Sequence, residues 1–228
     1  MKKILILLIV VMVSCTSSNK KVIFLGDSIT QNAVINSEKF KGFISLLEEN
    51  IDQNTELIGK GIGGDKVSDL LTRYRDDVIK LNPDMVFIYI GINDVWHKYD
   101  YGTGTDIDLY ENGLRQIITD LKENGVKVIL CTPTVIGENK GEFTLVNQFK
   151  DIETMEIMNN DLDDYSDIIR KLSREFDTKL LDLRKIFMQY ISENNPENKS
   201  KGVLTTDGVH LNNIGSKLIA DEMIKFIN

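Results

Sequence analysis

The sequence has few of the residues that cross-link or divide a chain. Its 228 residues include two cysteines, Cys15 and Cys131, and three prolines. No Pro-rich or Ser-rich segment separates one half from the other, so the sequence predicts a single domain. If Cys15 is consumed by processing near the start of the chain, Cys131 has no partner for an intramolecular disulfide. Because Cys131 ends an apolar run, we expect it to be a buried, inert thiol.

Basic clusters are also missing. The formal net charge is -8, the pI is about 4.9, and Lys and Arg occur singly or in short pairs. This pattern argues against a nucleic-acid partner, which requires a concentrated positive surface. A hydrophobic content of 42% with 27% charged residues is that of an ordinary globular protein. A small molecule or an uncharged polymer is therefore the expected partner.

The first residues form a segment of a different kind. Lys2 and Lys3 are followed by ten apolar residues at 4–13, and then by Ser14 and Cys15. About 20 apolar residues are needed to span a bilayer, so this pattern predicts an export signal. A small residue before Cys15 resembles the bacterial lipoprotein signal, in which the cysteine is lipidated and becomes the new N-terminus; the alternative is a plain secretory signal cut nearby.

This pattern divides the chain into a signal peptide with a polar tether at 1–19 and one domain at 20–228. It also predicts an exported lipoprotein, held in the membrane by its N-terminal lipid at the bacterial cell surface or in the periplasm.

After the tether, short β-branched runs alternate with longer amphipathic segments. The expected strands are residues 22–25, 56–58, 85–90, 126–130 and 179–181. The expected helices are residues 37–50, 67–81, 109–123, 155–176 and 211–227. Such alternation predicts an α/β fold, a parallel sheet with helices on both faces. Loops at 95–105 and 132–154 would then extend beyond carboxyl ends of strands, where open sheets place their sites.

Four polar clusters fall at strand ends or just before the last helix. They are Gly-Asp-Ser at 26–28, Gly-Ile-Gly-Gly-Asp at 61–65, Gly-Ile-Asn-Asp at 91–94 and Asp-Gly-Val-His at 207–210. The carboxyl ends of parallel strands share one edge of the sheet, so the first three clusters should converge there. One glycine-rich corner alone could be an ordinary turn, but four clusters in this arrangement indicate a site.

The residue types in these clusters fit acyl transfer. Ser28 needs a base to accept its proton, and the base needs a third group to fix its tautomer. His210 has Asp207 three residues earlier, and we favour it as the base. His97 follows Trp96 and is expected in a loop, at the surface or against substrate. The N–H groups of Ser28 and Gly64, with the amide of Asn93, would donate hydrogen bonds to an oxyanion.

With these motifs in this order, the chain resembles the SGNH, or GDSL, hydrolases. The matching segments are GDSIT at 26–30, GIGGD at 61–65, GIND at 91–94 and DGVH at 207–210. The resemblance implies a three-layer, flavodoxin-like sandwich with a five-stranded parallel sheet and the same roles for Ser28, His210, Asp207, Gly64 and Asn93. It also implies a carboxylic ester hydrolase that needs no cofactor and no metal.

The substrate is less well defined by the sequence. Within the resembled family, both carbohydrate O-acetyl esterases and lipid acylhydrolases of the lysophospholipase or thioesterase type occur. We favour short-chain acyl groups on carbohydrate because the chain has no Leu- and Phe-rich lid. Asp27, Asp94 and Trp96 are candidate substrate contacts, and Trp96 with Tyr99 and Tyr101 could form a sugar-stacking platform.

Three other functions would each account for part of the sequence. Residues 59–64 satisfy G-x-G-x-x-G between a strand and a helix, as in dinucleotide-binding domains, but the next strand ends without the required acidic residue. A metal-dependent phosphoesterase would use several aspartates with His97 and His210, yet two histidines are few for a two-metal site. A surface binding protein without activity would be expected to have lost part of the Ser28, His210 and Asp207 set.

Overall fold

The five strands form one parallel sheet. The computed structural model describes residues 19–138 and 152–228. The strands are β1 (Lys20–Gly26), β2 (Thr55–Gly61), β3 (Met85–Tyr89), β4 (Lys127–Cys131) and β5 (Lys179–Leu181). Their order is β2-β1-β3-β4-β5, and each neighbouring pair is parallel. The predicted strands are therefore confirmed, with bounds that differ by a few residues.

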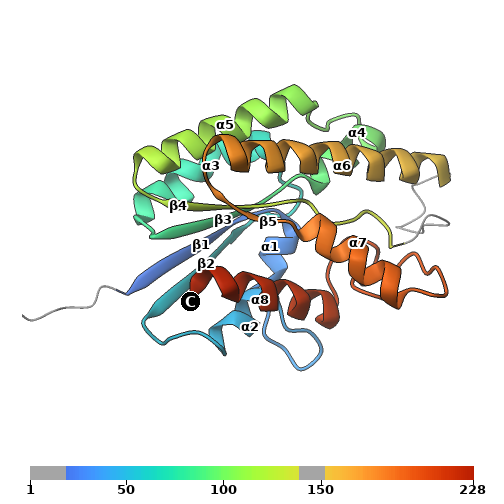
Figure 1. Ribbon diagram of the computed structural model, residues 1–228, viewed down its shortest axis with the longest axis horizontal. Coiled ribbons are helices and arrows are strands. Elements are labelled where there is room, and N and C mark those ends of the chain that lie inside the picture. Colours follow the sequence, from blue (N-terminus) through green and yellow to red (C-terminus); the bar gives the residue numbers. More distant parts are fainter. Residues whose placement is uncertain (1–18, 139–151) are drawn as a thin grey trace, which may run out of the picture.

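Helices cover both faces of the sheet, as Figure 1 shows. One layer contains α3 (Val67–Asp77), α4 (Ile92–Asp100), α5 (Ile107–Glu123) and α6 (Ile152–Glu175). The other contains α1 (Ser28–Asn32), α2 (Phe43–Glu48), α7 (Leu183–Asn194) and α8 (Asn213–Ile227). A 3₁₀ turn, Ile79–Leu81, follows α3. This arrangement confirms the predicted three-layer α/β sandwich.

The core explains why the strands are continuously apolar. Every residue of β3 is buried, and so are the last five residues of β1. The rings of Phe24 and Phe87 on these neighbouring strands stack with centroids 5.1 Å apart. Strands covered on both faces need apolar side chains at successive positions, which gives these runs. Cys131, at the end of β4, is fully buried, and burial raises the pKa of its thiol.

Four of the described helices depart from the sequence-based expectation, and one of them, the short helix α1, was not expected at all. The segment expected as a loop at 95–105 begins instead with helix α4, so the loop prediction for Trp96 and His97 was wrong. Helix α7 was missed, although Leu183, Phe187 and Ile191 have helical spacing and are all buried. The helix expected at 37–50 is reduced to α2, because residues 36–41 form a tight turn closed by a bridge between Asn36 and Lys41. Residues 139–151 of the loop expected at 132–154 lie outside the described residues.

The glycines of residues 59–64 do not form a phosphate loop. Gly59 and Gly61 lie inside β2 and pair with Phe24 and Gly26 of β1. A Cβ atom at Gly61 would lie 2.1 Å from the backbone nitrogen of Gln31, so glycine there lets α1 pack against the end of β2. The dinucleotide-binding interpretation is therefore wrong, since these glycines serve strand and helix packing.

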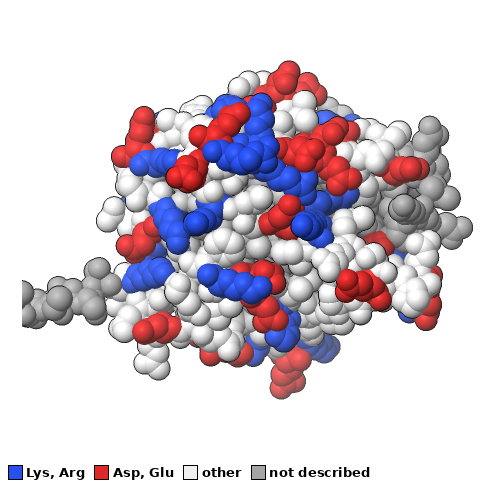
Figure 2. Space-filling model, in the orientation of Figure 1, with Lys and Arg blue, Asp and Glu red and all other residues white. Residues whose placement is uncertain are grey.

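Surface charge is mixed on the face drawn in Figure 2, where Lys and Arg alternate with Asp and Glu and form no continuous basic stripe among the described residues. None of the helices in residues 19–138 and 152–228 has the length and apolar character needed to cross a membrane.

Candidate active site

Ser28 lies directly beyond the carboxyl end of β1. Strand β1 ends at Gly26, and Ser28 is the first residue of helix α1. Asp27 caps this helix, because its Oδ1 accepts a hydrogen bond of 2.9 Å from the N–H of Ile29. The N–H groups in the first turn of a helix have no partner within the helix. The turn therefore presents both the hydroxyl and the N–H of Ser28 at the edge of the sheet.

His210 and Asp207 meet this serine from the opposite end of the chain. The Nε2 atom of His210 lies 3.0 Å from Ser28 Oγ, although the two residues are 182 positions apart. The other ring nitrogen, Nδ1, lies 2.7 Å from Asp207 Oδ2. Asp207 Oδ1 accepts hydrogen bonds from the N–H groups of Val209 and His210 at 3.0 and 2.8 Å. One short loop therefore fixes the carboxylate and the imidazole together against Ser28.

The electrostatics of this pair favour a charged imidazole next to a charged carboxylate. The hydrogen bond to Asp207 raises the pKa of His210 above its ordinary value, although burial acts in the opposite direction. Burial acts to raise the pKa of Asp207, but hydrogen bonds from His210 and from backbone N–H groups bring it below its ordinary value. Such an arrangement stabilises an imidazolium formed when a proton is taken from Ser28.

Gly64 and Asn93 lie at the carboxyl ends of the neighbouring strands. Gly64 follows β2 with a φ of 83° and is exposed. Asn93 is 4% exposed in the first turn of α4, beyond β3, and its Nδ2 donates a hydrogen bond of 3.0 Å to the carbonyl of Asp65. An amide nitrogen carries two N–H donors, so this bond uses one and orients the other. The three predicted oxyanion donors thus come from the ends of β1, β2 and β3.

Arg73 joins two of these strand ends, which sequence analysis did not anticipate. Its Nη2 donates to Gly26 O at 2.9 Å, and its Nη1 donates to Lys60 O at 3.0 Å. Its Nε donates to Asp65 Oδ2 at 2.7 Å. Asp65 in turn accepts the amide of Asn93 on its carbonyl, so Arg73 links all three loops. A single arginine in an amphipathic helix gives no sequence signal that it points inward.

Asp27 and Asp94, for which the sequence predicts substrate contact, are both buried, and that role stays a prediction. Asp27 is 2% exposed and Asp94 is 0% exposed. Asp94 Oδ1 accepts the N–H of Val67 at 3.0 Å, which fixes the start of α3. Burial raises the pKa of Asp27 to about 7 and the pKa of Asp94 to about 6. These two carboxylates therefore stabilise the backbone of the site by accepting N–H groups at the starts of α1 and α3.

The aromatic residues expected in a loop belong to helix α4 or its end. Trp96 is partly buried and packs against the core. His97 stacks edge-to-face on Tyr101 with ring centroids 5.0 Å apart, and burial lowers its pKa. His97 thus packs on Tyr101 of the same helical segment rather than on Ser28, and substrate contact by Trp96 stays a prediction. Within the described ranges, no three His, Cys, Asp or Glu side chains are grouped to hold a metal ion.

A groove of about 320 Å³ opens beside His210. Ile35, Phe40 and Thr206 contribute to its walls, together with Asn213 at the start of α8. Asn213 holds the turn that carries Phe40, because its side chain accepts the N–H of Lys41 and donates to Lys39 O, each at 3.0 Å. A larger cavity, about 480 Å³, lies between α6 and α7, but neither Ser28 nor His210 lines it. Of these two, only the smaller groove is lined by His210.

This fold, with a serine, a histidine and an aspartate joined at the edge of a parallel sheet, is that of a carboxylic ester hydrolase. Residues 24–218 match the model of the GDSL-like lipase/acylhydrolase family. The match covers most of the chain, and the protein belongs to this family.

Its relatives include enzymes that act on acetylated xylan. The chain is 27% identical to an acetylxylan esterase of Geobacillus stearothermophilus, over 92% of this chain and 94% of that protein. It is 24% identical to the uncharacterized lipoprotein YqeF of Bacillus subtilis, over 95% and 93%. The crystal structure of the acetyl xylan esterase AlAXEase superposes with a TM-score of 0.78 and 44% identity, over 91% of this chain and 100% of that one.

The buried Asp27 should make stability depend on pH. Its pKa in the folded protein, about 7, exceeds the ordinary 3.8, so the folded state holds a proton that the unfolded state has lost. Stability should therefore fall as pH rises between these two values. Asp27→Asn keeps an oxygen that can accept the Ile29 N–H but cannot ionise. We expect this variant to lose at least about 1 kcal/mol less unfolding free energy between pH 5 and pH 8 than the parent protein does. Urea denaturation at both pH values measures this.

The matched control is Asp76→Asn, which changes a side chain that is 70% exposed. It should leave the difference between pH 5 and pH 8 as in the parent protein. An Asp27→Asn variant with the parent's pH dependence would show that this carboxylate is already ionised at no cost.

Proposed function

We propose that the protein is a serine esterase that removes acetyl groups from carbohydrate, and that Ser28, His210 and Asp207 form its catalytic triad. The observation that carries this proposal is the continuous hydrogen-bonded path from Asp207 through His210 to Ser28 Oγ, with distances of 2.7 and 3.0 Å. In this path the carboxylate can accept from one ring nitrogen while the other ring nitrogen accepts the hydroxyl proton, as general-base catalysis requires.

In the first step, His210 Nε2 accepts the proton of Ser28 while Oγ attacks the ester carbonyl carbon. The N–H groups of Ser28 and Gly64 and the amide of Asn93 donate hydrogen bonds to the resulting oxyanion. The C–O bond then breaks, and His210 returns the proton to the leaving alcohol. Water, deprotonated by His210, attacks the acyl-serine and releases acetate, which restores the Ser28 hydroxyl.

The related enzyme Axe2 supports these assignments. Structures of its catalytic mutants have alanine in place of a serine, an aspartate or a histidine. The aspartate and histidine replaced there are three positions apart, as Asp207 and His210 are here. Axe2 is described as an acetylxylan esterase, and also as an acetyl-xylooligosaccharide esterase. Together with AlAXEase, this favours acetylated xylan or its oligosaccharides as the substrate class.

The groove beside His210 is suited to the alcohol part of the substrate. His210 must protonate the leaving oxygen, so the sugar has to lie on the histidine side of the reacting carbon. The oxyanion donors Gly64 and Asn93 come from the other strand ends. Phe40, which is partly exposed in the groove, offers an aromatic face for a sugar ring. A small acetyl group would then occupy the space between Ser28 and the sheet edge.

The central test is acetate release from acetylated xylo-oligosaccharides. We expect the purified protein to release acetate with unchanged kcat in EDTA, and Ser28→Ala to lose at least about 10³-fold in kcat because the nucleophile is absent. Ser192→Ala, which removes an exposed serine hydroxyl from α7, should retain full activity.

Two results would contradict this proposal. Activity retained in Ser28→Ala would assign the nucleophile elsewhere, and activity lost in EDTA would favour metal-assisted hydrolysis. If long-chain acyl esters were hydrolysed far faster than acetylated oligosaccharides, the triad would stand but the substrate class would be a lipid.

The role of Phe40 can be tested separately by varying the alcohol. Phe40→Ala should lower kcat/KM for acetylated xylotriose about fivefold or more, because an aromatic contact contributes about 1 kcal/mol. It should change kcat/KM for ethyl acetate less than about twofold, since ethanol is too small to reach the ring. Phe40→Tyr keeps the aromatic face and should behave like the parent. Equal losses on both substrates would show that Phe40 acts on the site as a whole.

We also propose that the mature protein begins at a lipidated Cys15 and that residues 1–19 act as signal and tether for a hydrolase domain at 20–228. Cys15 lies outside the described residues, so the support comes from the sequence pattern and from the resemblance to the lipoprotein YqeF. In a bacterial host fed labelled palmitate, the parent protein should acquire label and sediment with membranes. Cys15→Ser should do neither; an unlabelled, secreted parent protein would indicate a plain secretory signal.

A further inference from the structure

The loop that carries Asp207 and His210 is held by a buried carboxylate from a different part of the chain. We call residues 203–212 the base loop. Glu138, which is 2% exposed, follows strand β4 and lies against the start of this loop. Its Oε1 accepts hydrogen bonds from Leu204 N and Thr205 Oγ1, both at 2.7 Å, and from Thr205 N. Its Oε2 accepts Val203 N at 2.7 Å.

These contacts continue to the residues next to the proposed triad. Thr205 Oγ1 donates to Glu138 and also accepts the N–H of Gly208 at 3.0 Å. The N–H of Gly137 donates to Gly208 O at 2.8 Å, so Gly208 is held through both of its backbone polar groups. Gly208 lies between Asp207 and His210 in the sequence. Two consecutive hydrogen bonds through Thr205 Oγ1 therefore connect Glu138 to the segment between Asp207 and His210.

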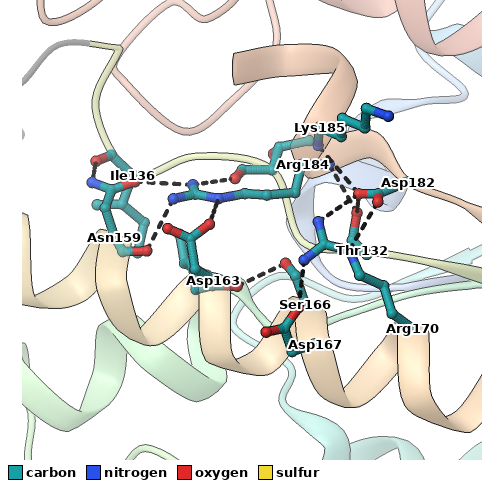
Figure 3. A network of polar contacts seen from close by, with 12 residues as sticks. Thr132, Ile136, Asn159, Asp163, Ser166, Asp167, Arg170, Asp182, Arg184 and Lys185 are labelled. Atoms are coloured by element: carbon teal, nitrogen blue, oxygen red, sulfur yellow. Dashed lines mark hydrogen bonds and ion pairs between the residues drawn. The ribbon is translucent and has the colours of Figure 1, made fainter. Parts of the chain in front are cut away.

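The segment that supplies Glu138 is itself clamped by Arg184, which is 2% exposed. Figure 3 shows the guanidinium of Arg184 reaching from α7 between Asn159 and Asp163 of α6. It donates to Thr134 O at 2.7 Å and to Asp163 Oδ1 at 2.8 Å, and Asn159 donates to Ile136 O at 2.6 Å. The carbonyls of residues 134 and 136 are thus fixed just before Glu138. These hydrogen bonds fix the backbone that carries Glu138, and so they fix the position of its carboxylate against the base loop.

The side chain of Glu138 can be buried at low cost in free energy only if its carboxylate keeps these hydrogen bonds. A buried carboxylate is costly unless it accepts several donors, and Glu138 accepts four. Removing it would leave three backbone N–H groups without their acceptor, so the base loop would have to rearrange. Base-loop geometry matters because a displacement of about 1 Å at reacting groups can cost about 10²-fold in rate.

We propose that Glu138 is a positioning residue that sets the distance and orientation of His210 relative to Ser28, acting through Thr205 and Gly208. The proposal rests on the triad assigned above. Two readouts separate the proposals: the kcat for acetate release, which needs the triad to be correct, and the titration of His210, which reports the geometry of the base loop without any reaction.

The test compares purified Glu138→Gln and Thr205→Val with Thr205→Ser. Gln keeps the size of the side chain but places an NH₂ group against a backbone N–H, and Val keeps the shape of Thr without Oγ1. Both should lower kcat about 10- to 100-fold with KM changed less than about threefold. Thr205→Ser keeps the hydroxyl that Thr205→Val lacks, so it should retain most of the parent's kcat. Thermal unfolding establishes that each variant is folded.

The second readout is ¹H NMR titration of the two histidines. The charged groups that face His210 are Asp207 and Asp27, and both raise its pKa, Asp207 most strongly through its hydrogen bond. If the base loop moves, this bond weakens, and the pKa of His210 should fall toward 6.5 in Glu138→Gln and Thr205→Val. His97, on α4, provides an internal reference whose titration should not change.

Glu111→Gln is the matched control, because Glu111 links α5 to α6 through Lys171 at 2.9 Å and has no contact with the base loop. It should leave kcat and the His210 titration unchanged even if stability falls. Folded Glu138→Gln with the parent's kcat and His210 titration would overturn the proposal. If Glu138→Gln does not fold, the same result in Thr205→Val would overturn it. Should Ser28→Ala retain activity, the triad fails, and the titration alone then decides the role of Glu138.

Discussion

The site depends on the register of three parallel strands. Gly26 at the end of β1 is paired with Gly61 of β2 on one side and with Tyr89 of β3 on the other, so all three strands end at the same level. The polar loops that follow, at Ser28, Gly64 and Asn93, are therefore neighbours without needing long connections. Arg73 converts this alignment into a fixed arrangement, because one guanidinium binds the carbonyls of Gly26 and Lys60 and the side chain of Asp65. A shift of β1 or β2 along its axis would break these hydrogen bonds of Arg73.

Much of this part could be predicted from the sequence. Apolar runs located the strands, and the glycine-rich polar clusters after them located the loops, because both features follow from local periodicity and from the shared edge of a parallel sheet. Asp207 and His210 could also be paired, since their spacing is local. Helix α4 could not, because the polar residues Asn93, Asp94 and His97 interrupt the apolar pattern that indicates a helix. The burial of Asp27 and Asp94 was missed for a related reason, since a sequence does not show that a carboxylate accepts backbone N–H groups inside the fold.

Glu138 and Arg73 escaped prediction for another reason. Each is a single charged residue whose partners include backbone groups distant in the sequence, and such pairings leave no local pattern. A charge in an amphipathic helix or a loop is most often solvated, so the inward orientation of these two side chains becomes evident only when the chain is folded. Within the described residues, the partly buried Arg73 links the strand-end loops and the buried Glu138 holds the base loop.

The two halves of the site are consequently fixed by different means. Ser28 and the proposed oxyanion donors Gly64 and Asn93 are positioned by the ends of the sheet strands that precede them. His210 lies on the loop between α7 and α8, which contains no strand of the sheet, so its position must come from other contacts. Asn212 caps α8 and donates its N–H to Leu204 O at 2.9 Å, and Glu138 holds residues 203–205. Because the distance from His210 to Ser28 spans both halves, it is the part of the geometry most sensitive to contacts outside the sheet. Residues that tune the base therefore belong in the segment after β4 and the start of α8, and residues that tune the oxyanion donors belong in α3.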